Sequence, residues 1–224
     1  MFTHQKGTLK GFRKLISIGL HKLFFMDELS TLAGIVGSDG HLSKSENAVI
    51  IVNKDLEFIN ETVVPLLKKL TKNKISISKT SSGYSSYKYL VRVWDKNLQE
   101  ILHKNYGIPR GKKYFINLPS LPSDKMISFI LGWIAGDGSV TVDRKRPKIE
   151  IWSKDVKLMR KFQKFLFERE IGSTIFKASN NRWILRIGKR DDVKKFSNFK
   201  IPHPAKDRKL KSFLAPAEAG FRTS

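Results

Sequence analysis

The sequence predicts an α+β fold made of two similar units, each with the element order helix, strand, strand, helix, strand, strand, helix. Three observations predict it: a motif that recurs about 100 residues further along the chain, an apolar helix ending at Asp-Gly in each copy, and strand-like alternation behind each helix. A chain of 224 residues is long enough to bury a core. It contains no cysteine, so it must fold without disulfides.

Three landmarks recur in the same order. The segment LAGIVGSDG at 32–40 is repeated in form as ILGWIAGDG at 130–138, VIIVNKDL at 49–56 as IEIWSKDV at 149–156, and GIP at 107–109 as KIP at 200–202. Such self-similarity indicates two copies of one unit. The predicted divisions are a basic N-terminal extension (1–26), a first unit (27–109), a linker (110–125), a second unit (126–203) and a C-terminal tail (204–224).

The elements of each copy follow from local patterns. Strands are predicted at 48–52 and 149–152, and hairpins at 74–79 with 87–94 and at 173–178 with 182–188. Periodic apolar residues after Asp55 and Asp155 predict a helix in each unit, and Pro65 is expected to kink the first of these. A last short helix is expected near Asp95 and near Asp191. We expect Gly40 and Gly138 to close the motif helices in the left-handed conformation.

The two motif helices are apolar on nearly all sides, so both are predicted to be buried. Small residues lie four apart in each helix, Gly34 and Ser38 in the first and Gly132 and Gly136 in the second. Such faces let two helix backbones approach closely. We therefore expect the helices to pack against each other.

Each motif helix ends at an acid, Asp39 or Asp137. An aspartate in the last turn faces the negative end of the helix dipole, and two carboxylates brought close together resist joint ionisation. A divalent cation with oxygen ligands, most simply Mg²⁺, would offset both effects. The alternative is that Asp-Gly is an ordinary turn dipeptide. Its occurrence twice, in register on apolar helices, favours the metal.

The charge balance points to nucleic acid. Forty-three Lys and Arg against twenty Asp and Glu give a net charge of +23, which predicts a strongly positive surface. An anionic membrane surface or a structural RNA is the alternative. No apolar run approaches the length of a membrane helix, and we expect no membrane association. The histidines lack zinc-site spacing and are predicted to be surface or loop residues: His4, His21, His41, His103 and His203.

Over residues 27–202 the motifs resemble the LAGLIDADG homing endonucleases, specifically the compact, monomeric, two-motif members encoded in archaeal or organellar introns. The resemblance implies two pseudo-symmetric αββαββα units whose antiparallel sheets form a DNA-binding saddle. It implies that Asp39 and Asp137 bind Mg²⁺, a site that Mn²⁺ or Ca²⁺ could occupy. It further implies hydrolysis of both strands of a long asymmetric DNA target across the minor groove, leaving 3′ overhangs.

The resemblance also implies a polar and a basic residue beside the metal in each half. The matching positions are Asn53 and Lys54 in the first unit, and Ser153 and Lys154 in the second. The alternative is that Asn53 and Ser153 cap helices and that the lysines are solvated. Some relatives carry a lysine just after the second motif, where this chain has Val140.

The candidate DNA contacts are polar and basic side chains expected on one face of the sheets. They are His41, Ser43, Lys44, Lys79, Tyr84, Tyr87, Lys88, Arg92, Thr141, Asp143, Arg144, Arg146, Lys177, Arg182 and Arg186. They could read bases or hold phosphates. Two other functions stay open on the same fold, an RNA maturase that binds intron RNA and a DNA-binding protein without cleavage activity. The absence of cysteine is compatible with a reducing compartment.

Overall fold

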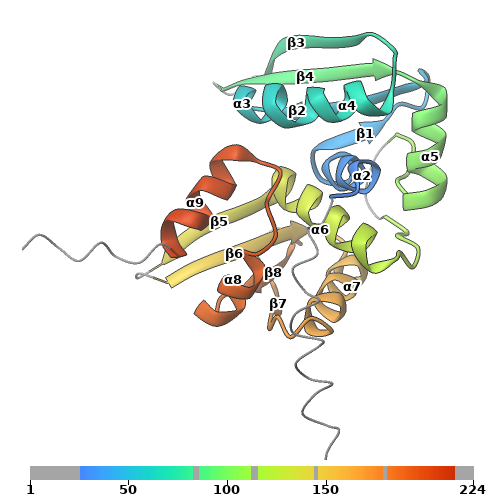
Figure 1. Cartoon of the computed structure of the whole chain (residues 1–224). Helices are drawn as coiled ribbons and strands as arrows, with labels where there is room; N and C mark the ends of the chain where they lie inside the picture. The colour runs from blue at the N-terminus through green and yellow to red at the C-terminus, as the bar shows by residue number, and fades with distance from the viewer. Residues whose placement is uncertain (1–25, 83–85, 112–115, 144–145, 179–180, 215–224) are drawn as a thin grey trace, which may run out of the picture.

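The computed structural model describes residues 26–82, 86–111, 116–143, 146–178 and 181–214. Two four-stranded antiparallel sheets lie on opposite sides of a central pair of helices, α2 and α6 (Figure 1). The strand orders are β1-β2-β4-β3 and β5-β6-β8-β7, the same order in each sheet. This correspondence confirms the α+β fold of two similar units.

The first unit has the predicted element order. Its elements are α2 (Glu28–Asp39), β1 (Gly40–Leu42), β2 (Ala48–Asn53), α3 (Leu56–Phe58), the π-helical η2 (Ile59–Val63), α4 (Val64–Leu70), β3 (Ile75–Ser82), β4 (Ser86–Trp94) and α5 (Lys96–Tyr106). The irregularity expected at Pro65 takes the form of the π-helical segment η2, which ends two residues before it. Proline has no backbone N–H to donate, so the regular α-helical bonding cannot run through this position.

The second unit repeats the order and is followed by one more helix. Its elements are α6 (Ser123–Asp137), β5 (Gly138–Asp143), β6 (Arg146–Ser153), α7 (Val156–Phe167), β7 (Thr174–Lys177), β8 (Trp183–Ile187) and α8 (Arg190–Phe196), and α9 (Pro204–Leu214) comes last. Helix α6 begins inside the predicted linker, and Ile116 and Leu118 of that linker are buried. Residues 204–214, predicted as a tail, form α9 and bury Leu210.

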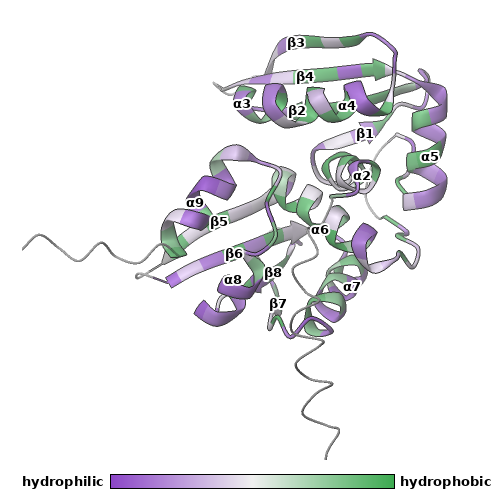
Figure 2. Cartoon of the chain, in the orientation of Figure 1, coloured by the Kyte–Doolittle hydropathy of each residue, from purple (hydrophilic) through white to green (hydrophobic). Residues whose placement is uncertain are grey.

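Aspartates begin the helices that position the site. The side chain of Asp27 accepts a hydrogen bond from the backbone of Ser30 and so caps α2. Asp55 caps α3 and Asp155 caps α7 in the same way. Such caps satisfy backbone N–H groups that have no partner inside the helix. Hydrophilic residues dominate the outer helices α8 and α9, while hydrophobic residues concentrate toward the middle of the molecule (Figure 2).

Helices α2 and α6 pack with their backbones in contact, as the small residues predict. A Cβ added to Gly34 would lie 2.1 Å from the carbonyl oxygen of Phe129, and one added to Gly132 would lie 2.1 Å from that of Thr31. At Gly136 an added Cβ would meet Ser38 Oγ at 2.0 Å. Only glycine therefore permits this approach.

The expected conformation of Gly40 and Gly138 was wrong. Both are extended, with φ of −120° and −86°, and each begins a strand directly after its helix. An added Cβ would lie 2.6 Å from the Ile50 oxygen at Gly40 and 2.5 Å from the Ile134 oxygen at Gly138. Glycine is required here by close backbone contact and not by a left-handed turn. Among the described residues, none of the helices is long and apolar enough to cross a membrane.

Candidate active site and nucleic-acid interface

The packed helices bring the two aspartates together. A Cβ on Gly136, the neighbour of Asp137, would lie 3.1 Å from the carboxyl carbon of Asp39. Asp39 is partly buried and Asp137 is exposed. Within the described parts of the chain, no cluster of three or more acidic or histidine side chains could hold a metal. Two carboxylates are a suitable protein contribution for Mg²⁺, which commonly takes its other ligands from phosphate and water.

Asn53 holds the first aspartate in place. Its Nδ2 donates a hydrogen bond of 2.5 Å to Asp39 Oδ2, and its Oδ1 accepts one from the backbone of Asp55. The cap of the following helix is Asp55, so the alternative role of Asn53 as a cap does not apply. Because Asn53 ends β2, the strand fixes the amide that orients the carboxylate.

Ser153, at the position that matches Asn53, repeats only the contact with the backbone of the residue two positions further on. Its Oγ accepts a hydrogen bond of 3.0 Å from the backbone of Asp155, which itself caps α7. Ser153 nevertheless lines a pocket with Asp137. The two halves of the site are therefore chemically different.

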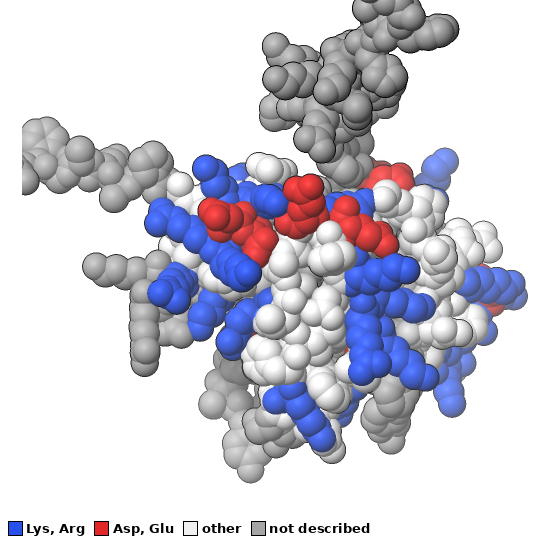
Figure 3. All heavy atoms as spheres, turned by 90° about the horizontal axis from the view of Figure 1, so that it is seen from below, with Lys and Arg blue, Asp and Glu red and all other residues white. Residues whose placement is uncertain are grey.

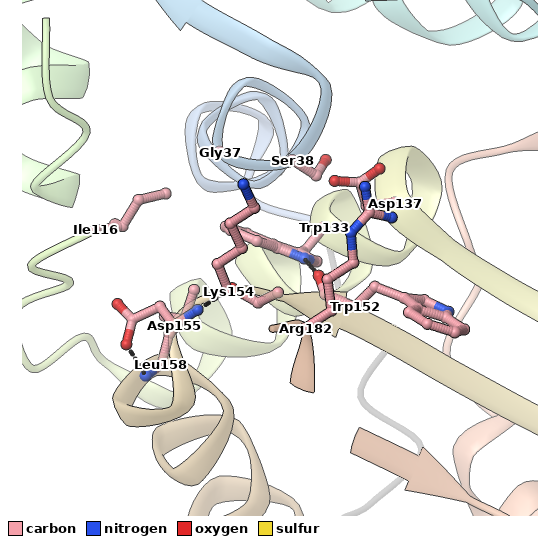
Figure 4. Close-up of a pocket in the computed structure, with 11 residues that line it drawn as sticks. Gly37, Ser38, Ile116, Trp133, Asp137, Trp152, Lys154, Asp155, Leu158 and Arg182 are labelled. Carbon is pink, nitrogen blue, oxygen red and sulfur yellow. Dashed lines mark hydrogen bonds between the residues drawn. The ribbon is translucent and has the colours of Figure 1, made fainter. Parts of the chain in front are cut away.

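The pocket beside Asp137 has a volume of about 410 Å³ and lies between the ends of α2 and α6 and the start of α7. Lys154 extends across it toward Gly37, and Arg182 points toward the carboxylate of Asp137 (Figure 4). Lys154 and Lys54 are both exposed at the corresponding ends of β6 and β2. The carboxylate of Asp137 and two cationic side chains, Lys154 and Arg182, therefore line the same pocket.

Lys206 is a site residue that the sequence analysis missed. Its Nζ, on α9, donates hydrogen bonds of 2.9, 2.7 and 2.7 Å to the carbonyl oxygens of Ile134, Ala135 and Gly136 at the end of α6. Burial lowers the pKa of Lys206 to about 8, against the attraction of Asp39 and Asp137. A cation at a helix C-terminus offsets the helix dipole. Lys206 therefore supplies positive charge that the motif itself, with buried Val140, does not carry.

His203 was predicted to be a surface or loop residue, and its side chain is buried. It is 5% exposed and stacks on Phe58 with ring centroids 4.6 Å apart. Its Nε2 lies 3.5 Å from Asp55 Oδ2. Burial lowers the pKa of His203 to about 4, with Lys206 acting in the same direction. The histidine joins the start of α9 to the first unit.

In the first sheet, the register places His41, Lys88 and Arg92 on the face away from the core. His41 pairs with Ile50, which pairs with Arg92, while the core residues Val49, Ile51 and Val93 alternate with these positions. We call this the open face of the sheet. Sequence analysis did not include the β3 residues on the same face, which are Ser76, Ser78 and Thr80. Ser43 and Lys44 follow β1.

In the second sheet, the open face carries Thr141, Arg146 and Arg186. Arg186 forms a 2.7 Å ion pair with Glu150, its cross-strand neighbour, and lies 4.4 Å from the ring centroid of Phe176. Asp143 ends β5 opposite Arg146.

The expectation that all candidates share one face was wrong. Lys79 and Tyr87 lie in register with the core-facing positions of β3 and β4, and Lys177 does so on β7. Lys79 Nζ lies 3.8 Å from the ring centroid of Tyr87 near the end of the hairpin. Tyr84 and Arg144 lie outside the described residues.

Basic side chains also lie on the outer helices, for example Arg190, Lys194 and Lys195 on α8. Seen from below in the frame of Figure 1, Lys and Arg spread over much of the molecule, and acidic residues gather in a narrower band (Figure 3). The charge of the chain is therefore not confined to the open faces.

Comparison with known families identifies this arrangement. Residues 124–199, which include most of α6 and the rest of the second unit through α8, match the family model of the LAGLIDADG-like domain. Solved structures with this fold match most of the chain, beyond the part that the family model matches. The chain has the two-unit LAGLIDADG fold.

The LAGLIDADG fold of this chain is similar to that of the homing endonuclease I-DmoI. A structure of mesophilic I-DmoI variants matches with a TM-score of 0.60 and 22% identity, over 77% of this chain and 90% of that chain. A complex of I-DmoI with DNA and Mn matches with a TM-score of 0.55 and 22% identity, over 75% and 92%. Another I-DmoI structure is a complex with DNA and Ca, and another is a complex with target DNA in the presence of Mg.

The LAGLIDADG fold is also similar to that of DUF199/WhiA from Thermatoga maritima, with a TM-score of 0.60 and 16% identity, over 85% of this chain and 60% of that chain. No curated protein matches the sequence. At these identities the structural similarity establishes the fold.

Proposed function

We propose that the protein is a site-specific double-strand DNA endonuclease that acts as a monomer on a long asymmetric target. It hydrolyses one phosphodiester in each strand across the minor groove and leaves 3′ overhangs. The observation that carries this proposal is the meeting of Asp39 and Asp137 at the adjoining ends of two helices whose backbones touch. The I-DmoI complexes with target DNA support it.

Asp39 and Asp137 would hold a divalent cation, most simply Mg²⁺, with Mn²⁺ or Ca²⁺ as possible occupants. Such a cation activates water and stabilises charge on the leaving oxygen. The residues fit, because hard cations prefer oxygen ligands and both carboxylates lie at the same end of the helix pair. Asn53 keeps one carboxylate oriented, and Lys206 offsets negative charge at the end of α6.

The open faces would bind the duplex. Lys88, Arg92, Arg146 and Arg186 lie on these faces and would contact phosphates or base edges, together with the β3 hydroxyl groups. Arg92 and Arg186 are each held by an acid, Glu46 at 3.7 Å and Glu150 at 2.7 Å. Side chains fixed in this way lose less conformational freedom when DNA binds.

A DNA-binding protein without cleavage activity is the second candidate. It is favoured by one observation, namely that DUF199/WhiA, whose name does not describe an endonuclease, has the same fold over 85% of this chain. The fold alone therefore does not establish cleavage. The pair of aspartates at the helix ends favours the endonuclease.

The test is incubation of the full chain with a randomised duplex library in Mg²⁺ or Mn²⁺, followed by sequencing of the cut ends. We expect one family of related sites with 3′ overhangs, and no cutting in EDTA. Asp39→Asn and Asp137→Asn serve as controls, because each removes one charge with little change in shape. Enrichment of a bound site that is never cut would support the second candidate.

A further inference from the structure

The two halves of the site differ in the burial of the aspartate and in the side chain that ends the neighbouring strand. Asp39 is partly buried and bonded to Asn53. Asp137 is exposed, and the matching Ser153 is turned to the backbone of Asp155. A serine has no amide with which to repeat the contact that Asn53 makes with Asp39, so the two halves offer a bound phosphate different neighbours.

In the Asp137 half, one such neighbour is Arg182. We infer that Arg182 binds the scissile phosphate of the DNA strand that lies at Asp137, and that this contact is specific to that strand. The inference rests on the proposed endonuclease function. Arg182 and Lys154 extend into the pocket of about 410 Å³ from two different segments of the chain, Arg182 toward Asp137 and Lys154 toward Gly37 at the end of α2 (Figure 4).

The short hairpin of the second unit sets this position. Ser153 pairs with Trp183 at the end of the ladder, so Arg182 lies directly before β8, across from Lys154. The backbone N–H of Ala178 donates a hydrogen bond of 2.8 Å to the carbonyl oxygen of Arg182, and Asn181 beside it has a φ of 54°. The turn is thus closed on Arg182, which fixes the point from which its side chain reaches toward Asp137.

The first unit has no equivalent arrangement at the corresponding register. Asn53 pairs with Tyr89, so Lys88 corresponds to Arg182. There the hairpin does not end: Lys88 pairs with Thr80, and the ladder continues to Ser82 and Ser86. Lys88 is therefore a residue within a strand on the open face, whereas Arg182 sits at a turn beside the acid.

The chemistry of arginine suits this role. A guanidinium group donates two parallel hydrogen bonds to phosphate oxygens, stays protonated beside a carboxylate, and is less strongly hydrated than an ammonium group. Near Asp137 it would meet the phosphate where charge develops during hydrolysis. Removing a single such donor typically slows an enzyme by about 100-fold or more.

The experiment uses the full chain and the duplex recovered from the library, with a different fluorophore on each strand. Single-turnover cleavage in Mg²⁺ is followed at saturating protein for the wild type, Arg182→Ala and Arg182→Lys. Arg160→Ala is the matched control, because Arg160 is an exposed arginine on α7, which packs against the core side of the second sheet. Binding is measured separately without divalent metal.

We expect Arg182→Ala to slow cleavage of one strand by about 100-fold and to leave the other strand within about twofold, so that nicked DNA accumulates. Arg182→Lys should recover part of the rate, and Arg160→Ala should keep the wild-type ratio of the two strands. Equal slowing of both strands, or a loss of affinity alone, would overturn the inference while leaving the endonuclease function intact. Failure of the wild type to cut any duplex would overturn the proposed function, and this inference with it.

Discussion

Replacing Gly132 with alanine tests whether the contact between α2 and α6 sets the geometry of the site. The added Cβ would lie 2.1 Å from the Thr31 carbonyl oxygen, whereas ordinary contact begins at 3.4 Å. The helices would therefore have to separate by about 1.3 Å, because neither partner is a flexible side chain. A displacement of about 1 Å at reacting groups can cost about 100-fold in rate.

We expect Gly132→Ala to reduce cleavage by about 100-fold and to reduce DNA affinity much less. Overpacking of this kind costs about 3 kcal/mol, which lowers the melting temperature of a chain of this size by about 6 to 12 °C. Gly188→Ala is the control, since its Cβ would meet only Arg186 at 3.5 Å. Calorimetry and single-turnover cleavage would measure both effects. A Gly132→Ala protein that melts and cuts like the wild type would refute the argument that backbone contact positions the aspartates.

Three further predictions follow from the same structure. Asp39→Asn or Asp137→Asn should abolish double-strand cleavage and leave site binding largely intact in a gel-shift assay; full activity in either variant would disprove the assigned role. Affinity for DNA should fall steeply with salt, because bound phosphates release counterions, and a flat response would count against phosphate contacts. Burial lowers the pKa of His203 from 6.5 to about 4, so the unfolded chain takes up a proton that the folded chain does not. Stability should therefore fall by about 2 kcal/mol between pH 7 and pH 5 in urea melts, and His203→Gln should lack this loss.

The repeated units could be predicted from sequence because their signals are local. Apolar helices, spaced small residues and strand alternation each depend on neighbouring residues, and the structure follows them closely. The conformation of Gly40 and Gly138 could not be predicted in this way. Glycine serves left-handed turns and close backbone contacts equally well, and only the paired strand shows that Ile50 approaches Gly40.

The site was predicted incompletely because some of its residues depend on tertiary contacts. Lys206 lies 70 residues from Gly136, whose carbonyl oxygen it binds, and no local pattern connects them. Lys79 and Lys88 lie on opposite faces of the first sheet because of the strand register. A shift of the register by one residue would move every side chain of a strand to the other face. His203 was likewise assigned to the surface because its burial depends on Phe58, far away in the chain.

The segment after the second unit contacts both units. His203 stacks on Phe58, and Arg208 forms two hydrogen bonds of 2.8 Å with Glu57, both on the first unit. The exposed Arg208 pair contributes little by itself, since such pairs are worth about 0 to 1 kcal/mol, so the buried ring of His203 is the stronger tie. Between these two contacts lies Lys206, bonded to the end of α6 in the second unit. Helix α9 therefore joins the two units at the point where their aspartates meet, and a chain ending before it would lose both that connection and the cation beside the carboxylates.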